Sequence, residues 1–312
     1  MAISLFTFPV HGETENEEKM GLLWKISGNG LSAPSYLLGT AHNFPGEFVY
    51  SFPRFEEAFD SIEQLIVEVD MLDSTKGTQI AAYTASLMKD RFLPDSVKYL
   101  DLVNETDLHL LDSFSLKYFK RTSDETRLRP AHLYNAMGIA MIGDLLEYIQ
   151  NDSLIILLKK VKEGSLSMDH FLAEKAKEKR YSIIELETVQ YQMELLLNPK
   201  ISQEQAIRYL LATLKDYETS MKMSGAMFQA VYAQDLRGMA DNMDKISQLS
   251  DLGDLYDDPI NLKERNLNWI PVIKTAIQEK GTMIAVGAGH LPWEYGLINL
   301  LRKEGYVVED FK

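Results

Sequence analysis

Two stretches of the sequence decide the fold: Tyr36-Leu37-Leu38-Gly39-Thr40-Ala41-His42 near the start, and Met283-Ile284-Ala285-Val286-Gly287-Ala288-Gly289-His290 near the end. Each stretch places a G-x-x-H motif directly after a short apolar run, which predicts a strand. A helix-like stretch and a second apolar run follow each motif. This repeated pattern indicates an internal duplication that brings His42 and His290 to the same edge of a sheet. A lone histidine is most often a loop or core residue, but two imidazoles at strand ends with carboxylates nearby are typical of a metal site.

The region around the first motif is predicted to be rich in strands. Residues 22–26 and 36–39 flank a Gly-Asn-Gly turn, which predicts a hairpin. Residues 53–62 have apolar side chains at helical spacing, with a proline in the first turn. The run at residues 65–70 is almost continuously apolar and β-branched, which indicates a strand buried on both faces of a parallel sheet.

The long segment between the two motifs is predicted to be mostly helical. Apolar residues spaced three and four apart predict helices at 131–148, 154–162, 169–179 and 261–279, and the segment from 189 to about 250 is also helical, with a strand at 181–187. After the second motif's strand at 282–286 come a helix at 292–304 and a strand at 305–310. We therefore expect an α/β (α+β) fold, with a small, mostly parallel sheet from two duplicated β-α-β units and a large helical insertion.

The domain organisation follows from these segments. A flexible tail is expected at residues 1–19, followed by one domain at 20–312. Its core would comprise residues 20–72, 180–188 and 260–312, and the helical insertion residues 73–179 and 189–259.

Composition and charge exclude several classes of function. The net charge of −14 argues against nucleic acid or an anionic membrane as the main partner, because neither offers counter-charge to an acidic surface. Zero cysteines exclude disulfides, thiolate nucleophiles and cysteine-ligated metals. No apolar stretch approaches the length of a membrane span. We expect a soluble protein without a clear signal peptide, whose compartment stays open between the cytoplasm and the cell envelope or exterior if the start is a truncated export signal.

Carboxylates at the ends of apolar strands are the next candidates. Glu68 and Asp70 end the run at 65–70, where a buried, unpaired carboxylate would be costly, although both could lie just beyond the buried part. Glu185 and Glu187, on the strand at 181–187, could likewise be buried and need a partner or lie just beyond the buried part. Arg265 opens an amphipathic helix, where it could clamp a carboxylate or an oxyanion or simply be a surface charge. The sequence contains no H-E-x-x-H, G-x-S-x-G, P-loop or G-x-G-x-x-G motif, which removes the common zincins, serine α/β-hydrolases and nucleotide-binding folds.

At these residues the chain resembles the TraB/GumN (Tiki-like) family. The matching stretches run in order from residue 22 to 308: LLWKISG (22–28), YLLGTAH (36–42), LIVEVD (65–70), Arg129-Pro130, DHFL (169–172), IELET (184–188) with Gln192, Glu264-Arg265-Asn266, VGAGHLP (286–292), and Gly296-Leu297, Leu301 and Gly305-Tyr306. Trp293 departs from the family pattern, which has a small residue after His-Leu-Pro, and would narrow the mouth of the site.

The resemblance implies two related βα units around a divalent-metal site, and a hydrolase of the metallopeptidase type. On that basis we expect His42, His290 and Glu68 to hold a divalent metal (Mn, Co or Zn). Glu187 would be the general base and Arg265 would stabilise the oxyanion, and Asn266 is a further candidate catalytic residue. The helical insertion would form a lid that selects a peptide or protein substrate. The alternative is a non-catalytic protein of the same fold that sequesters a peptide or a haem-like ligand.

Overall fold

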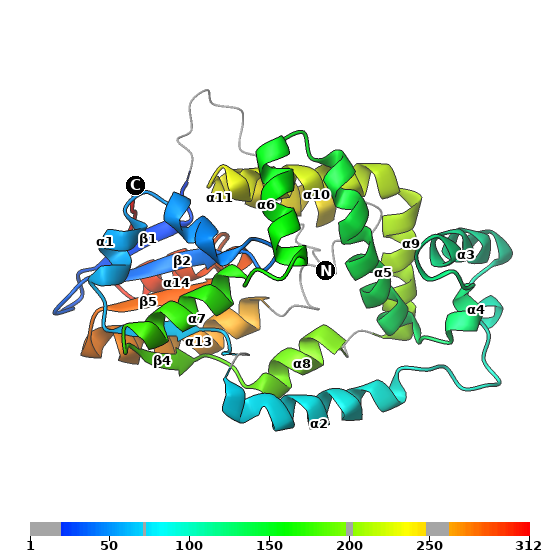
Figure 1. The fold of residues 1–312 in the computed structure, drawn as a ribbon, viewed down its shortest axis with the longest axis horizontal. Coiled ribbons are helices and arrows are strands. Elements are labelled where there is room, and N and C mark those ends of the chain that lie inside the picture. The colour runs from blue at the N-terminus through cyan, green and yellow to red at the C-terminus, as the bar shows by residue number, and fades with distance from the viewer. Residues whose placement is uncertain (1–19, 71–72, 198–201, 248–261) are drawn as a thin grey trace, which may run out of the picture.

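The computed structural model describes residues 20–70, 73–197, 202–247 and 262–312. The expected N-terminal tail at 1–19 lies outside the described residues. The architecture is the predicted mixture of a mostly parallel sheet and many helices (Figure 1). Among the residues that the structure describes, no helix combines the length and the apolar character that crossing a bilayer requires.

Six strands form one sheet in the order β4-β3-β5-β2-β1-β6. The strands β2, β5, β3 and β4 are parallel neighbours, and β1 runs antiparallel to both β2 and β6. Because β1 is antiparallel to both of its neighbours, β6 points the same way as β2 and β5. Each duplicated unit, β2 to β3 and β5 to β6, therefore connects two strands that run in the same direction. The bounds are β1 (Leu23–Ser27), β2 (Ser35–Thr40), β3 (Gln64–Val67), β4 (Ser182–Glu185), β5 (Thr282–Gly287) and β6 (Val307–Asp310).

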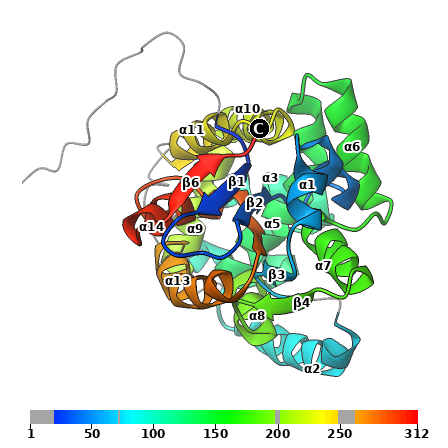
Figure 2. The same ribbon diagram turned by 90° about the vertical axis from the view of Figure 1, so that its left-hand side faces the viewer.

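The three central strands are buried as the apolar runs predict. Every residue of β2 and β3 is buried, and β5 is buried up to its last residue, Gly287. The predicted hairpin joins β1 and β2, and its turn holds Gly28, Asn29 and Gly30 at positive φ, which glycine and asparagine tolerate best. Helices cover both faces of the sheet: α13 (Leu262–Glu279) and α14 (Leu297–Lys303) lie on one side, and α1 (Phe55–Asp60) and α7 (Met168–Glu178) on the other (Figure 2).

The remaining helices form the predicted insertion, which extends beyond the carboxyl ends of the parallel strands (Figure 1). Its pairs of packed helices include α10 with α11, α5 with α9, and α2 with α8. The bounds are α2 (Gly77–Leu87), α3 (Glu105–Phe119), α4 (Ser123–Thr126), α5 (Pro130–Leu145), α6 (Asp152–Lys162), α8 (Val189–Leu197), α9 (Gln203–Lys215), α10 (Tyr217–Tyr232) and α11 (Leu236–Ser247).

One helix differs from its prediction. The helix expected at 292–304 begins only at Leu297. Trp293 adopts a left-handed φ of 67°, and a Cβ on Gly296 would lie 1.8 Å from the carbonyl oxygen of Pro292. This tight turn delays the helix, and its tryptophan donates a hydrogen bond of 3.2 Å from Nε1 to Asp244 of α11.

Candidate functional site

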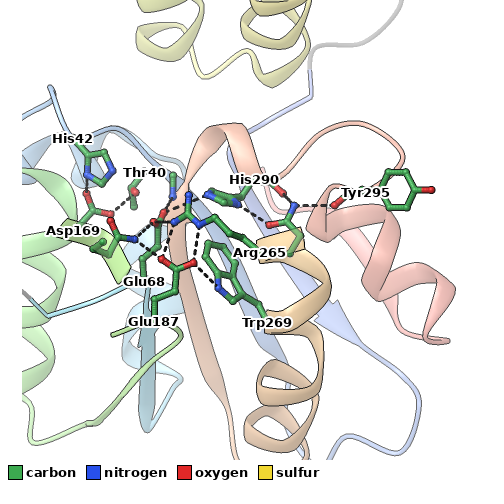
Figure 3. A network of polar contacts seen from close by, with 12 residues as sticks. Thr40, His42, Glu68, Asp169, Glu187, Arg265, Trp269, His290 and Tyr295 are labelled. Atoms are coloured by element: carbon green, nitrogen blue, oxygen red, sulfur yellow. Dashed lines mark hydrogen bonds and ion pairs between the residues drawn. The ribbon is translucent and has the colours of Figure 1, made fainter. Parts of the chain in front are cut away.

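The carboxyl ends of the four parallel strands carry the predicted side chains in one row. Glu187 follows β4, Glu68 follows β3, His290 follows β5 and His42 follows β2. Figure 3 draws the two histidines on either side of Glu68. In open α/β sheets this edge is where ligands bind, so the duplication places its motifs where chemistry is expected.

Arg265, from the first turns of α13, joins the two glutamates. Its Nη2 donates to Glu68 Oε2 over 2.6 Å, and its Nε and Nη2 donate to the two oxygens of Glu187 over 2.7 and 3.0 Å (Figure 3). The side chains of Arg265 and Glu187 are each 5% exposed and that of Glu68 is 11% exposed. The cluster therefore contains two carboxylates and one guanidinium, withdrawn from water and bonded in the two-pronged geometry that arginine provides.

Two uncharged donors complete the bonding of these carboxylates. Gln192 Nε2 donates to Glu187 over 2.6 Å and to Glu68 over 3.1 Å. Trp269, one turn after Arg265 on α13, donates from Nε1 to Glu187 over 3.1 Å. Both oxygens of Glu187 thus accept two hydrogen bonds each, which holds it in place and fixes the guanidinium of Arg265.

Glu68 is the glutamate that faces His290. Its Oε1 accepts a hydrogen bond of 2.8 Å from the backbone N–H of Gly287 and lies 3.8 Å from His290 Nε2. Burial opposes ionisation, but the interactions with His290 and with the guanidinium of Arg265 and the hydrogen bond from Gly287 outweigh it, so the pKa of Glu68 is lowered. Glu68 is therefore ionised at neutral pH.

His290 is held as a neutral ring. Asn266 donates from Nδ2 to the backbone oxygens of His290 and Tyr295, over 3.1 and 2.8 Å, so its Oδ1 must accept the proton of His290 Nδ1, 2.6 Å away. The ring also packs on Trp269, with centroids 4.3 Å apart. Burial lowers the pKa of His290 to about 3. Nδ1 is thereby committed to Asn266, and Nε2 is left as an acceptor facing Glu68.

His42 has the opposite environment. Its side chain is 67% exposed, and its Nδ1 lies 2.7 Å from Asp169 Oδ2. Thr40 donates to the other oxygen of Asp169 over 2.5 Å. The carboxylate of Asp169 raises the pKa of His42 to about 9. This pairing again occupies Nδ1, and Nε2 of His42 has no hydrogen-bond partner among the described residues.

Asp169 reaches His42 because the segment before α7 is tied to the loop after β2. Pro45 and Ser167 form a β-bridge, and the N–H of Gly46 donates to Leu166 O over 2.7 Å. A Cβ on Gly46 would lie only 2.0 Å from Phe171 Cβ, so only glycine permits this approach.

The glycines of the two motifs act through close packing. Neither Gly39 nor Gly287 has positive φ, but a Cβ on Gly39 would lie 3.1 Å from Ala288, in the opposite motif. A Cβ on Gly287 would lie 3.3 Å from Glu68 Oε1. These small residues let the two motifs and Glu68 approach one another.

The other predicted carboxylates lie outside the hydrogen-bonded cluster of Arg265, although Glu185 lines the cavity of about 650 Å³ beside that cluster. Glu185 accepts a hydrogen bond of 2.5 Å from the N–H of Asp70 and pairs with Lys76. Asp70 also pairs with Lys177 of α7 over 2.6 Å. These contacts fasten the ends of β3 and β4 to neighbouring helices, which is a structural role.

Three residues of the site had no predicted role. Asp169 and Gln192 belong to stretches that carry the family resemblance, but nothing in their spacing shows what they touch. Trp269 lies four positions after Arg265, the helical spacing that puts both side chains on one face, and this signal could have found it.

A cavity of about 650 Å³ opens beside the cluster. Glu187, Arg265 and Trp269 line it on the side of the sheet, and residues of α2 and α8 line it on the side of the insertion. Its volume lies within the usual range for small-ligand sites. Arg265 Nη1 makes no hydrogen bond to the residues that the structure describes, so this donor remains available.

The donors of the site fit a divalent metal in chemistry and only partly in spacing. Two imidazole nitrogens and a carboxylate oxygen suit Mn, Co or Zn. His290 Nε2 and Glu68 Oε1, 3.8 Å apart, are within the roughly 4.2 Å that two metal–ligand bonds of about 2.1 Å can span. Within the described parts of the chain, however, no group of three or more histidine or acidic side chains is close enough to hold an ion.

Comparison with known proteins agrees with this arrangement at the level of the family. No curated protein and no solved structure matches the chain. The sequence profile of the TraB/PrgY/gumN family matches residues 22–310, which covers both G-x-x-H motifs, Glu68, Glu187 and Arg265. The chain therefore belongs to the TraB/PrgY/gumN family.

Proposed function

We propose that this protein is a metal-dependent hydrolase that cuts amide bonds in peptides, with a divalent metal held by His42, His290 and Glu68. One observation carries the proposal. Both motif histidines have Nδ1 engaged by an acceptor, Asp169 or Asn266, and neither Nε2 makes a hydrogen bond to the residues that the structure describes. Metal-binding histidines are usually oriented in this way, by an acceptor that binds the ring nitrogen opposite the one that holds the metal.

The other residues of the site have distinct tasks in this proposal. The metal would lower the pKa of a bound water and polarise the scissile carbonyl. Arg265 keeps Nε and Nη2 on the two glutamates and offers Nη1 to the oxyanion that develops on the substrate. Because all four acceptor positions of Glu187 are occupied, we assign it to holding Arg265 in place rather than to proton abstraction.

The first test is metal binding. Protein purified without chelator is analysed for metal, and its thermal unfolding is followed with excess Mn²⁺, Co²⁺ or Zn²⁺ and with chelator. An ion that binds only the folded state raises the midpoint by mass action. The rise should disappear in His42→Ala and in His290→Ala and persist in His109→Ala, a histidine exposed on α3.

The second test is turnover of a peptide library by the same four proteins. Wild type and His109→Ala should cut peptides, and the two motif variants should not. Equal midpoints with and without metal, together with full turnover in either motif variant, would exclude a metallohydrolase. Metal-supported peptide or haem binding without turnover would instead identify the protein as the non-catalytic binding alternative.

A further inference from the structure

A second, smaller cavity lies at the other end of the row of strand ends. Its volume is about 70 Å³. The insertion supplies its apolar walls, from α5, the turn after α5, α6 and α10: Ile142, Leu145, Leu146, Leu158, Val161 and Phe228. The remaining lining residue is Asn43, which directly follows His42 in the chain.

The strand order gives the spacing between the two strand ends that border the cavities. The large cavity borders Glu187 after β4, and the small one borders Asn43 after β2. Three strand spacings of about 4.8 Å separate β4 from β2, or roughly 14 Å in all. An extended peptide advances about 3.3 Å per residue, so about four residues would span the row and pass Glu68 and His290 on the way.

We propose that the small cavity is a side-chain pocket that selects an aliphatic residue of the peptide substrate, close to the amide bond that is cut. This inference rests on the proposed function and adds a substrate class to it. In this arrangement the peptide lies across the strand ends, with its aliphatic side chain among the helices of the insertion and its other end over Arg265. The insertion thereby acts as the selective part of the site.

The size and lining of the cavity define the side chain that it accepts. An apolar cavity of about 150 Å³ holds a benzene molecule, so a volume of about 70 Å³ suits the branched end of valine or leucine and is too small for an aromatic ring. Every wall from the insertion is a hydrocarbon side chain. A charged side chain would lose its water there without gaining a partner, which is costly.

Binding can be tested without any catalysis. Protein with labelled isoleucine methyl groups is titrated by NMR with N-acetyl-leucinamide, N-acetyl-phenylalaninamide and N-acetyl-lysinamide. Ile142 lines the pocket, whereas Ile139 on the same helix and Ile156 on α6 are 70% and 62% exposed and serve as internal controls. The leucine compound should shift Ile142 and leave the controls unmoved, and the other two compounds should shift none of them. No shift at Ile142, or equal shifts at all three residues, would overturn the proposal.

Selectivity is tested by filling or enlarging the pocket. Val161→Phe should reduce kcat/KM for peptides with leucine at this position by roughly tenfold or more, since a hydrophobic pocket discriminates single methylene groups by about that factor. Ile156→Phe adds the same ring to an exposed position of α6 and should change kcat/KM for these peptides less than about twofold. Ile142→Ala enlarges the pocket and should raise the ratio of phenylalanine to leucine peptides, whereas Ile139→Ala should not.

The outcomes separate the two proposals. Cleavage of peptides without any preference at this position, unchanged in Val161→Phe and Ile142→Ala, would refute the pocket and leave the hydrolase intact. A leucine-specific shift at Ile142 in a protein that cuts no peptide would refute the hydrolase and leave the pocket as a binding site.

Discussion

Replacing Arg265 by methionine should destabilise the protein strongly and in a way that depends on pH. Methionine keeps most of the hydrocarbon volume but leaves Glu68 and Glu187 as buried carboxylates without a counter-charge. Breaking a buried ion pair by removing one partner costs about 3–5 kcal/mol. For a chain of this size we expect the unfolding midpoint to fall by roughly 5–8 °C at pH 7.

The difference in unfolding midpoint between wild type and variant should change with pH in a defined direction. In the wild type the pKa of Glu68 lies below its ordinary value of 4.5, so its ionised form contributes stability above that pH, and the contribution is lost as the pH falls through the lowered pKa. Without Arg265, burial acts with less opposition and raises the pKa of Glu68, so the variant takes up a proton on folding and gains relative stability as the pH falls. The difference in midpoint should therefore shrink from pH 8 to pH 4.5.

The measurement is thermal unfolding by circular dichroism across this pH range, with chelator present so that bound metal does not contribute. Arg54→Met is the matched control, because Arg54 also forms a two-pronged pair, with Glu57, but both side chains are about half exposed. Surface pairs contribute at most about 1 kcal/mol. If Arg265→Met costs no more than the control, or if its deficit is constant with pH, the carboxylates do not depend on Arg265 as we argue.

Three further predictions concern the histidines and their supports. Asn266→Ala should free the ring of His290 to rotate and weaken metal affinity by roughly 10–100-fold, the usual effect of losing an orienting partner, as calorimetric titration with Mn²⁺ would show; unchanged affinity would contradict it. Metal binding should release a proton at pH 7.5, because Asp169 raises the pKa of His42 to about 9; the heat of binding should then vary with the ionisation enthalpy of the buffer, and this dependence should weaken as the pH is raised toward 9. Gly46→Ala should destabilise the protein by about 1–3 kcal/mol or more in urea, because the new Cβ meets Phe171; a neutral result would mean that α7 shifts freely.

The fold could be predicted from local pattern because its signals are local. The continuous apolar run of β3 predicted a strand buried on both faces of a parallel sheet, and the Gly28-Asn29-Gly30 turn predicted the hairpin. The repetition of strand, G-x-x-H and helix indicated two crossovers in one direction, as the sheet has them. The delayed start of α14 was missed because Trp293 takes a left-handed conformation, and a tryptophan in the sequence gives no signal for that conformation.

The site could be predicted only in part, because its bonds join distant segments. Alternation along the strand puts Glu68 and Asp70 on the same side, so sequence could not tell which of them meets Arg265, 197 positions after Glu68. The pairing of Thr40 with Asp169 spans 129 positions and depends on how α7 docks. The type of a residue and its position at the end of a strand thus predicted that it lies at the carboxyl edge of the sheet. Its hydrogen-bond partner depends on tertiary packing, which local sequence does not show.

The two motifs show how far a duplication can diverge while its backbone is kept. Both histidines leave a sheet end in the same way, yet His290 is buried, neutral and bonded to an amide, and His42 is exposed, charged and bonded to a carboxylate. A metal requires both rings to be neutral, so His290 is ready at any physiological pH and His42 must first give up its proton. The energetic difference between the two proposed ligands therefore arises from Asp169 and Asn266, which α7 and α13 bring to otherwise similar motifs.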